Sequence, residues 1–308
     1  MRLFAFSTTA LLSYCANVAW ALSTPQQQPC WSSTTGQRYL YVRAAATTTA
    51  APPLLIIPGT AQSIELWQQH VPFFSRTRSV IICEPLGLGL QVPKNVDMDL
   101  AAQAETLQKT LTSINIVGDN SGVGIMDIAG FSLGGRIAMA LACQYSDVVN
   151  RLHLTGVALQ RSSWGTLQID AWKNLLDNDH DDLRPFAWSA LLASYAPDFL
   201  VGQRDKLPMW IDGVASRHTV AGLRQLIRQT HNADDDWSVA AMTKRLPPGI
   251  KGRLCVGEGD QLAPAEQVQA LAKTLAWSPP SVIPRAAHVP PIENPRAWRK
   301  DLEDFLNE

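Results

Sequence analysis

The chain contains the stretch Asp127-Ile128-Ala129-Gly130-Phe131-Ser132-Leu133-Gly134-Gly135-Arg136, with the pattern Gly-x-Ser-x-Gly at Gly130, Ser132 and Gly134. The apolar residues before it predict a buried strand, and the run at 137–142 predicts a helix. A serine at such a junction lies on a sharp turn, which projects its hydroxyl above the carboxyl-terminal edge of a sheet. We expect both glycines to be required, because a Cβ at either position would clash with the neighbouring strand and helix.

Short apolar runs and helical patterns alternate on both sides of this stretch. Runs of strand character lie at 37–43, 54–57, 80–83, 151–159, 252–256 and 281–283. Helical patterns lie at 63–74, 97–111, 263–275 and 295–306. This alternation predicts right-handed crossovers, and therefore an α/β fold with a mostly parallel sheet.

The alternation of strand and helix patterns stops between about residues 160 and 245. Here the sequence is helical, acidic in places and rich in tryptophan. The tryptophans of this region are Trp164, Trp172, Trp188, Trp210 and Trp237. We predict a helical lid that covers the carboxyl-terminal edge of the sheet. Most of its tryptophans should pack between helices, and one or two should line a pocket. Such a lid, with few cations, suits a partly apolar and uncharged substrate.

Serine attack on a carbonyl requires a base that takes the hydroxyl proton and a carboxylate that orients the base. Asp260 follows the strand at 252–256, and His288 follows the last strand. Both should therefore lie at the same sheet edge as Ser132. We predict that Ser132 is the nucleophile, His288 the base and Asp260 the acid that orients it.

Other roles for these side chains stay open at this point. Ser132 could be only a helix cap, and Asp260 could cap a helix that begins near Pro264. The acidic run at 234–236 lies in the insertion, where such a run usually forms a solvated face. The remaining histidines, which do not directly follow a strand, are His70, His153, His180, His218 and His231.

Three motifs resemble those of the α/β-hydrolase fold family, over roughly residues 37–308. They are Gly-Phe-Ser-Leu-Gly-Gly at 130–135, Val-Gly-Glu-Gly-Asp-Gln-Leu-Ala-Pro at 256–264, and Ala-His-Val-Pro-Pro-Ile-Glu-Asn-Pro at 287–295. Their order, with serine first, aspartate second and histidine last, is the order that the family shows. The resemblance implies a doubly wound, mostly parallel sheet with a helical lid inserted after the sixth strand.

The resemblance also implies an oxyanion hole made by the backbone N–H groups of Leu133 and Thr60, with Ala61 as a neighbouring possibility. The family commonly has His-Gly at the loop where this chain has Pro58-Gly59. Proline has no N–H, but the expected donor comes later, at Thr60, so the hole can still form. The resemblance implies no metal and no organic cofactor.

These residues predict a serine hydrolase that cleaves an ester or thioester of a partly apolar small molecule through an acyl-enzyme. A carbon–carbon bond hydrolase, or a lyase that uses the same three residues, would have the same sequence pattern. A third alternative is a non-catalytic protein that binds a ligand on this scaffold.

The composition limits the partners. The 308 residues are 46% hydrophobic and 17% charged, with a net charge of −1, as is typical of a globular protein with a sizeable core. A nucleic-acid surface would require a marked basic excess, so we expect a small-molecule substrate and no nucleic-acid partner. The oligomeric state stays open.

The amino-terminal residues predict targeting rather than folding. Residues 1–21 are mostly apolar and end in Ala19-Trp20-Ala21, as a cleaved signal peptide does, and 22–36 form a low-complexity leader. The segment is too short and polar for a stable membrane span. We expect an organelle interior, for example a plastid, with secretion as the alternative. The five cysteines, at 15, 30, 83, 143 and 255, do not form a disulfide framework.

Overall fold

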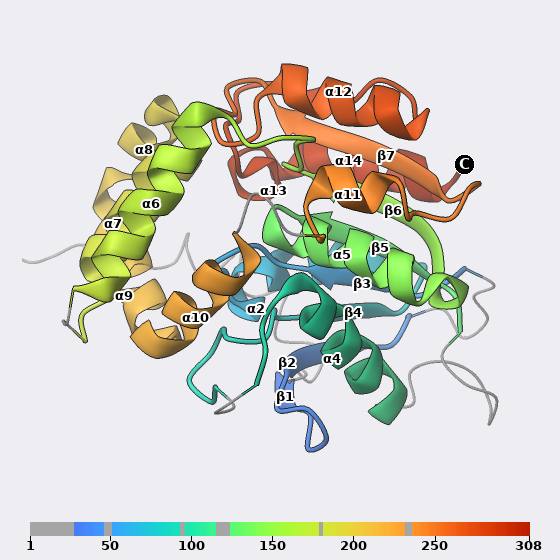
Figure 1. Cartoon of the computed structure of the whole chain (residues 1–308), viewed down its shortest axis with the longest axis horizontal. Coiled ribbons are helices and arrows are strands. Elements are labelled where there is room, and N and C mark those ends of the chain that lie inside the picture. Colours follow the sequence, from blue (N-terminus) through green and yellow to red (C-terminus); the bar gives the residue numbers. More distant parts are fainter. Residues whose placement is uncertain (1–27, 46–50, 93–95, 115–123, 179–180, 232–235) are drawn as a thin grey trace, which may run out of the picture.

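Figure 1 shows a computed structural model, which describes residues 28–45, 51–92, 96–114, 124–178, 181–231 and 236–308. Eight strands of this part form one sheet in the order β1-β2-β4-β3-β5-β6-β7-β8. Only the pairings of β2 with β1 and with β4 are antiparallel. The strands are β1 (Cys30–Trp31), β2 (Arg38–Val42), β3 (Leu54–Ile57), β4 (Val80–Cys83), β5 (Met126–Phe131), β6 (Val149–Thr155), β7 (Lys251–Gly257) and β8 (Ser281–Ile283). The expected mostly parallel α/β sheet is confirmed.

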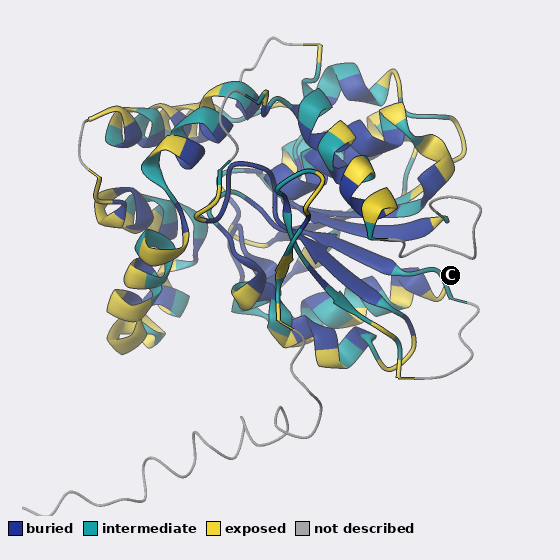
Figure 2. Ribbon diagram, turned by 90° about the horizontal axis from the view of Figure 1, so that it is seen from below, coloured by how far each residue is buried: buried dark blue, intermediate teal, exposed yellow. Residues whose placement is uncertain are grey.

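Helices cover both faces of the sheet, so its central strands are buried on both sides (Figure 2). In β3, Leu55 and Ile57 pack in one hydrophobic cluster while Leu54 and Ile56 pack in the other. Because both faces of β3 are buried, its sequence is a continuous apolar run rather than an alternating one. One cluster contains α4 (Leu100–Ser113), α5 (Leu133–Gln144) and α12 (Ala265–Leu275). The other contains α2 (Ile64–Trp67), α3 (Val71–Phe74) and α14 (Pro295–Leu306).

A helical insertion separates β6 from β7, and its first five helices lie beside one end of the sheet (Figure 1). They are α6 (Ser163–Asp177), α7 (Arg184–Ser194), α8 (Pro197–Gly202), α9 (Leu207–Arg217) and α10 (Val220–Thr230). The sixth, α11 (Val239–Thr243), packs against α5 and α12 instead. The helical segment expected at about 160–245 is therefore present, but its last helix belongs to the body of the domain.

Three expected boundaries differ from the structure. The pattern at 63–74 forms α2, the 3₁₀ helix Gln68–His70 and α3 rather than one continuous α-helix, because Pro72 has no N–H to continue it. β6 ends at Thr155 rather than at 159, because Gly156 adopts a φ of 66° and turns the chain. Part of the leader expected at 22–36 belongs to the sheet, since β1 pairs with β2.

The predictions for the amino-terminal end concern mostly residues outside the described part, which begins at residue 28. Within that part, no helix is both long and apolar enough to cross a membrane. The four cysteines described are unpaired, with Cys83 and Cys255 buried, Cys143 partly buried and Cys30 exposed.

Candidate active site

Ser132 lies on a strained turn between β5 and α5, with a φ of 52° and a ψ of −115°. A non-glycine residue rarely adopts a positive φ, and here the surrounding packing enforces it. A Cβ on Gly134 would lie 2.0 Å from the carbonyl oxygen of Ile57 in β3. A Cβ on Gly130 would lie 2.5 Å from the Cα of Gly135 in α5. The steric reason expected for the two glycines is confirmed.

The structure brings together the three side chains that the sequence places far apart. Ser132 Oγ lies 3.0 Å from His288 Nε2, and His288 Nδ1 lies 2.8 Å from Asp260 Oδ2. A carboxylate oxygen can only accept, so His288 Nδ1–H donates to Asp260 and leaves Nε2 to accept the hydroxyl proton of Ser132. This tautomer is the one that a base acting on Ser132 requires.

Both oxygens of Asp260 are used. Oδ2 faces His288, while Oδ1 accepts the backbone N–H groups of Leu262 and Ala263, each at 2.9 Å. The loop after β7 therefore holds the Asp260 carboxylate in place independently of His288. Asp260 does not cap the helix near Pro264, as the alternative supposed: its donors, Leu262 and Ala263, precede α12, whose cap position Pro264 has no side-chain cap.

A second carboxylate holds the loop that carries His288. Glu293 accepts the N–H groups of Ala287 and Val289, at 3.0 and 2.9 Å, and that of Ala196 at 2.7 Å. Burial raises the pKa of Glu293 despite these three donors. Glu293 thus joins the histidine loop to the segment between α7 and α8. Sequence reasoning assigned it no role, although it stands in the motif that contains His288.

The expected oxyanion donors lie on the wall of the same cavity as Ser132. Thr60 and Leu133 both line it, and neither N–H has an acceptor among the described residues. The preceding Gly59 N–H is already used, because it donates to Gln62 Oε1 at 3.1 Å. Trp67 Nε1 donates to the same oxygen at 3.0 Å, so Gln62 fixes the loop that follows β3. The Pro58-Gly59 departure therefore leaves the N–H of Thr60 available.

The cavity has a volume of about 1030 Å³ and lies between the sheet edge and the inserted helices. Among the insertion's tryptophans, Trp172 and Trp210 line it, in agreement with the expectation that one or two would do so. The sequence did not predict three further residues of the wall: Arg161, His218 and His231. Only the fold brings them there, and no local motif marks them.

The rival acids and histidines do not compete for this position. Asp234, Asp235 and His180 lie outside the described residues. His70 is fully buried, and neither ring nitrogen has a hydrogen-bond partner. Burial lowers its pKa to about 3, with a small further effect of Arg299. His153 belongs to a different His–Asp pair.

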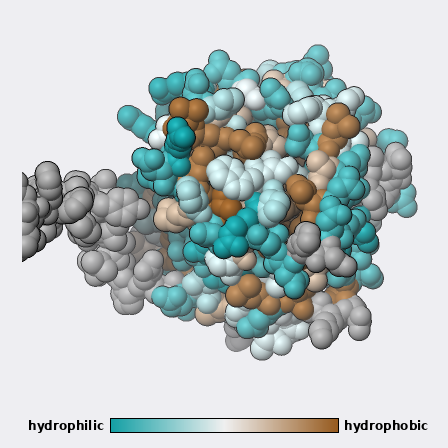
Figure 3. All heavy atoms as spheres, turned by 90° about the vertical axis from the view of Figure 1, so that its left-hand side faces the viewer, coloured by the Kyte–Doolittle hydropathy of each residue, from teal (hydrophilic) through white to brown (hydrophobic). Residues whose placement is uncertain are grey.

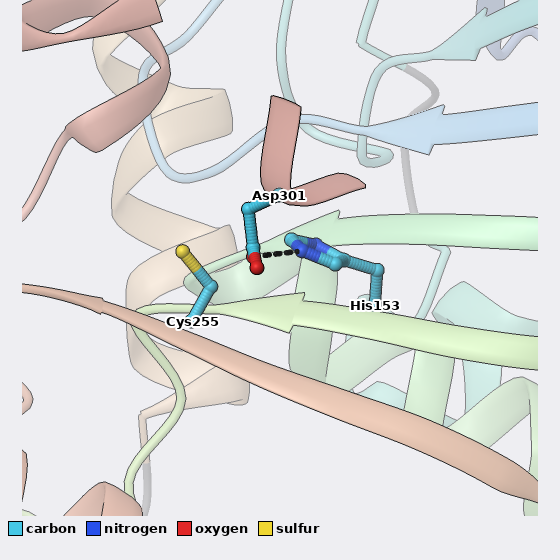
Figure 4. Close-up of side chains that lie close together, drawn as sticks. All are labelled: His153, Cys255 and Asp301. Carbon is cyan, nitrogen blue, oxygen red and sulfur yellow. Dashed lines mark hydrogen bonds and ion pairs between the residues drawn. The ribbon is translucent and has the colours of Figure 1, made fainter. Parts of the chain in front are cut away.

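This second pair belongs to the one cluster of the described residues whose side chains are of the types that bind metals. His153 in β6, Cys255 in β7 and Asp301 in α14 place their ligand-type atoms within 4.8 Å of one another (Figure 4). Asp301 also accepts from Ser281 Oγ at 2.6 Å and from Arg253 Nη1 at 3.2 Å. Burial raises the pKa of the Cys255 thiol well above its usual value. A protonated thiol and a carboxylate already neutralised by Arg253 form a hydrogen-bonded network, so we assign the cluster no metal.

Comparison with known sequences agrees with the fold. A family model described as the alpha/beta hydrolase family matches residues 54–300. The pyrrolizixenacetamide deacetylase of Xenorhabdus hominickii is 23% identical over 257 residues, which cover 82% of this chain and 90% of the relative.

Solved structures resemble the fold over almost its whole length. The enol-lactonase from Burkholderia xenovorans LB400 has a TM-score of 0.73 at 16% identity, over 91% of this chain and 100% of that one. A thermophilic esterase from Thermogutta terrifontis has a TM-score of 0.67 at 19% identity, over 92% and 98%. At such identities the likeness concerns the fold alone.

Proposed function

The chain belongs to the alpha/beta hydrolase family, an enzyme superfamily of hydrolases, and from this premise we propose that it is a serine hydrolase. We propose that it cleaves an ester or thioester of a partly apolar small molecule through an acyl-enzyme. The single observation that carries the proposal is the continuous chain of contacts from Ser132 through His288 to Asp260, at 3.0 and 2.8 Å. Nothing else in the described residues combines a hydroxyl, a base and an orienting acid beside a cavity.

In the proposed first step, Ser132 Oγ attacks the substrate carbonyl while His288 Nε2 takes the hydroxyl proton. Asp260 holds the tautomer and stabilises the imidazolium that forms. The N–H groups of Leu133 and Thr60 donate to the oxyanion of the tetrahedral intermediate. His288 then gives its proton to the leaving alcohol or thiol, and an acyl-Ser132 remains.

In the proposed second step, His288 takes a proton from water, and the resulting hydroxide attacks the acyl-Ser132. Collapse of the second tetrahedral intermediate breaks the Ser132 ester and returns the proton to the serine. The carboxylic acid leaves, and the site is restored. No group beyond this chain and water enters either step.

The walls of the cavity support a partly apolar substrate. Leu191, Phe199, Trp210 and Ile292 are among the apolar residues that line it. The space-filling view onto the side of the insertion shows brown, hydrophobic groups among hydrophilic ones (Figure 3). The large hydrophobic side chains that are exposed in α6 to α9 are Trp164, Leu167, Trp188, Leu192, Val201 and Met209. We propose that α6 to α10 act as the lid that selects the substrate.

Covalent labelling tests the proposed nucleophile. A fluorophosphonate probe should label the purified protein with one equivalent per chain, and mass spectrometry should place it on Ser132. The Ser132→Ala variant should not be labelled, and its kcat should fall by about 10⁶. Folded wild-type protein that resists the probe would instead favour the non-catalytic, ligand-binding alternative.

Substrate panels test the bond that is cleaved. p-Nitrophenyl esters of graded chain length, matching thioesters and an anilide should be compared by kcat/KM. The anilide is included because the Xenorhabdus relative is named a deacetylase. Oxygen from isotopically labelled water should appear in the acid product, whereas a lyase that uses the same three residues would release product without it.

A further inference from the structure

Arg161 is a partly buried cation on the wall of the cavity that Ser132 also lines. It lies between β6 and α6, at the point where the chain leaves the sheet for the insertion. Its Nη1 donates to the carbonyl oxygen of His231 at 3.2 Å. No carboxylate of the described residues lies within ion-pair distance of its guanidinium. A partly desolvated guanidinium without a counter-ion is costly, which suggests that its partner is supplied by a ligand.

The side chain of Arg161 is held in place rather than free to turn to solvent. A Cβ on Gly165 in α6 would lie 2.9 Å from Arg161 Cγ, so the helix packs directly on the arginine stem. The next residue, Ser162, donates its hydroxyl to the carbonyl oxygen of Gln261 at 3.1 Å. Gln261 directly follows Asp260 in the chain. The loop that carries Arg161 is therefore tied to the loop that carries the proposed catalytic acid.

This corner of the cavity is electropositive. Burial lowers the pKa of His231 well below its usual value, and the charges of Arg136, Arg161 and Lys173 lower it further. Arg136 lines the cavity too, in the first turn of α5 after Ser132. Burial lowers the pKa of Arg161, and the charge of Asp170 opposes this; Asp170 lies 4.0 Å from Lys173, on the exposed side of α6.

The other charges that the described residues place on the wall are paired. Besides Arg136 and Arg161, the charged residues among them that line the cavity are Glu65 and Arg217. Those two lie 3.8 Å apart, and Glu65 also pairs with Arg38. They therefore neutralise one another, whereas Arg161 forms no ion pair with a carboxylate of the described residues.

We propose that Arg161 binds a carboxylate on the substrate, so that the enzyme prefers esters whose acyl or alcohol part carries a second, ionised carboxyl group. The proposal rests on the proposed function and names its substrate class. A guanidinium offers two parallel N–H donors that match the two oxygens of a carboxylate, and a water-poor cavity strengthens the pair. The substrate is then apolar along its chain and anionic at one end, which departs from the uncharged molecule that composition suggested.

The test compares substrates that differ only in this charge. p-Nitrophenyl half-esters of straight-chain dicarboxylic acids, from six to ten carbons, are paired with the same esters bearing a terminal primary amide. The amide matches the carboxylate in shape but lacks its charge. For the chain length that reaches Arg161, wild-type kcat/KM should be about ten- to a hundredfold higher for the carboxylate.

The Arg161→Gln variant should lose this ratio, and Arg161→Lys should keep part of it, because lysine retains the charge but not the planar fork. Arg217→Gln is the matched control: it removes the same charge from the same cavity, yet the ratio should remain. A carboxylate-to-amide ratio near one at every length in the wild type would overturn the proposal. So would a preference that survives in Arg161→Gln.

A binding measurement separates this proposal from the proposed function. Calorimetric titration of Ser132→Ala with the half-ester and with the amide does not require turnover, and the half-ester should bind about ten- to a hundredfold more tightly. Hydrolysis of neutral esters without any carboxylate preference would overturn the role of Arg161 alone. Absence of hydrolysis and of probe labelling in the wild type, with the binding preference intact, would overturn the serine hydrolase alone.

Discussion

Two His–Asp pairs of the described residues have nearly the same geometry, but His288 lines the cavity beside Ser132 and His153 does not. His288 Nδ1 lies 2.8 Å from Asp260 Oδ2, and His153 Nε2 lies 2.9 Å from Asp301 Oδ2. The difference lies at the second ring nitrogen. His288 Nε2 meets the hydroxyl of Ser132 at 3.0 Å, whereas His153 Nδ1 is buried without a partner.

The surroundings of the two carboxylates differ as well. Asp260 accepts only from its own loop and from His288. Asp301 receives donors from three strands, and they hold its pKa below the ordinary value even though burial alone would raise it. The rings of Trp298 and Phe305 pack around His153, with centroids 6.1 and 6.0 Å away. A His–Asp pair thus becomes a candidate base only when the free nitrogen has a reactive partner and a substrate can reach it.

Among changes to the two pairs, the largest effect is expected from a substitution that breaks the first pair without disturbing its loop. In Asp260→Asn the side-chain oxygen still accepts from Leu262 and Ala263, but an amide donor now faces His288 Nδ1. His288 must then carry its proton on Nε2 and cannot accept from Ser132. We expect kcat to fall by about 10⁴, with little change in melting temperature.

Steady-state kinetics and thermal melts on the same preparation check this result. Asp260→Ala is the matched comparison, because it also removes the loop contacts and should melt at a lower temperature. Activity of Asp260→Asn within tenfold of the wild type would contradict the assigned role.

The corresponding change in the second pair should act on stability. Asp301→Asn keeps the shape but removes the charge that accepts from His153, Ser281 and Arg253. The free energy of unfolding should fall by about 2–3 kcal/mol, as for loss of hydrogen bonds to a buried charged group. Denaturant titration measures the loss, and kcat of the folded fraction should be unchanged. A loss of kcat like that of Asp260→Asn would show that the pair contributes to the chemistry.

A buried histidine with no acid at all, His70, should make the protein sensitive to acid. Its pKa of about 3 in the folded state lies below the usual 6.5, so the unfolded chain takes up its proton first as the pH falls. Stability should therefore decrease below pH 6.5, by up to about 1.4 kcal/mol per pH unit from this group. In His70→Met the slope of unfolding free energy against pH between 4 and 6 should decrease by about 1.4 kcal/mol per pH unit, which corresponds to one proton. An unchanged slope would assign the acid sensitivity to other groups.

The smallest expected effect concerns His218, which has no acid partner but contacts the site. Its Nδ1 accepts the N–H of Gly89 at 3.1 Å, and its ring also hydrogen-bonds the backbone of Ala61, beside Thr60. Ala61 itself has a φ of 57°, so this loop requires support. His218→Phe should lower kcat by about tenfold or less, which corresponds to the free energy of about one hydrogen bond. KM should change by a smaller factor than kcat. A change in KM alone would place His218 in substrate binding instead.

Much of the fold could be predicted because its signals are local. The Gly-x-Ser-x-Gly stretch, the buried run at 54–57 and the closing helix at 295–306 each carry their period or motif within a few residues. The positions of Asp260 and His288 follow from being directly after parallel strands, since the carboxyl ends of such strands share one edge.

The cavity wall could not be predicted in the same way. Arg161, His218 and His231 come from an insertion whose helices pack by surface complementarity, and no short pattern records which side chains face inward. Glu293 was visible in the sequence as part of a motif, yet its three backbone donors come from two segments that meet only in the folded chain.

The sequence by itself determined a mostly parallel sheet and the three side chains that meet at one edge of it, because these depend on periodicity and on steric limits at individual residues. Only the tertiary structure decided which of two similar His–Asp pairs lines the cavity, and which arginine of its wall has no carboxylate partner among the described residues. Access and charge balance depend on every element packed around a group, and so no single stretch of the chain contains them.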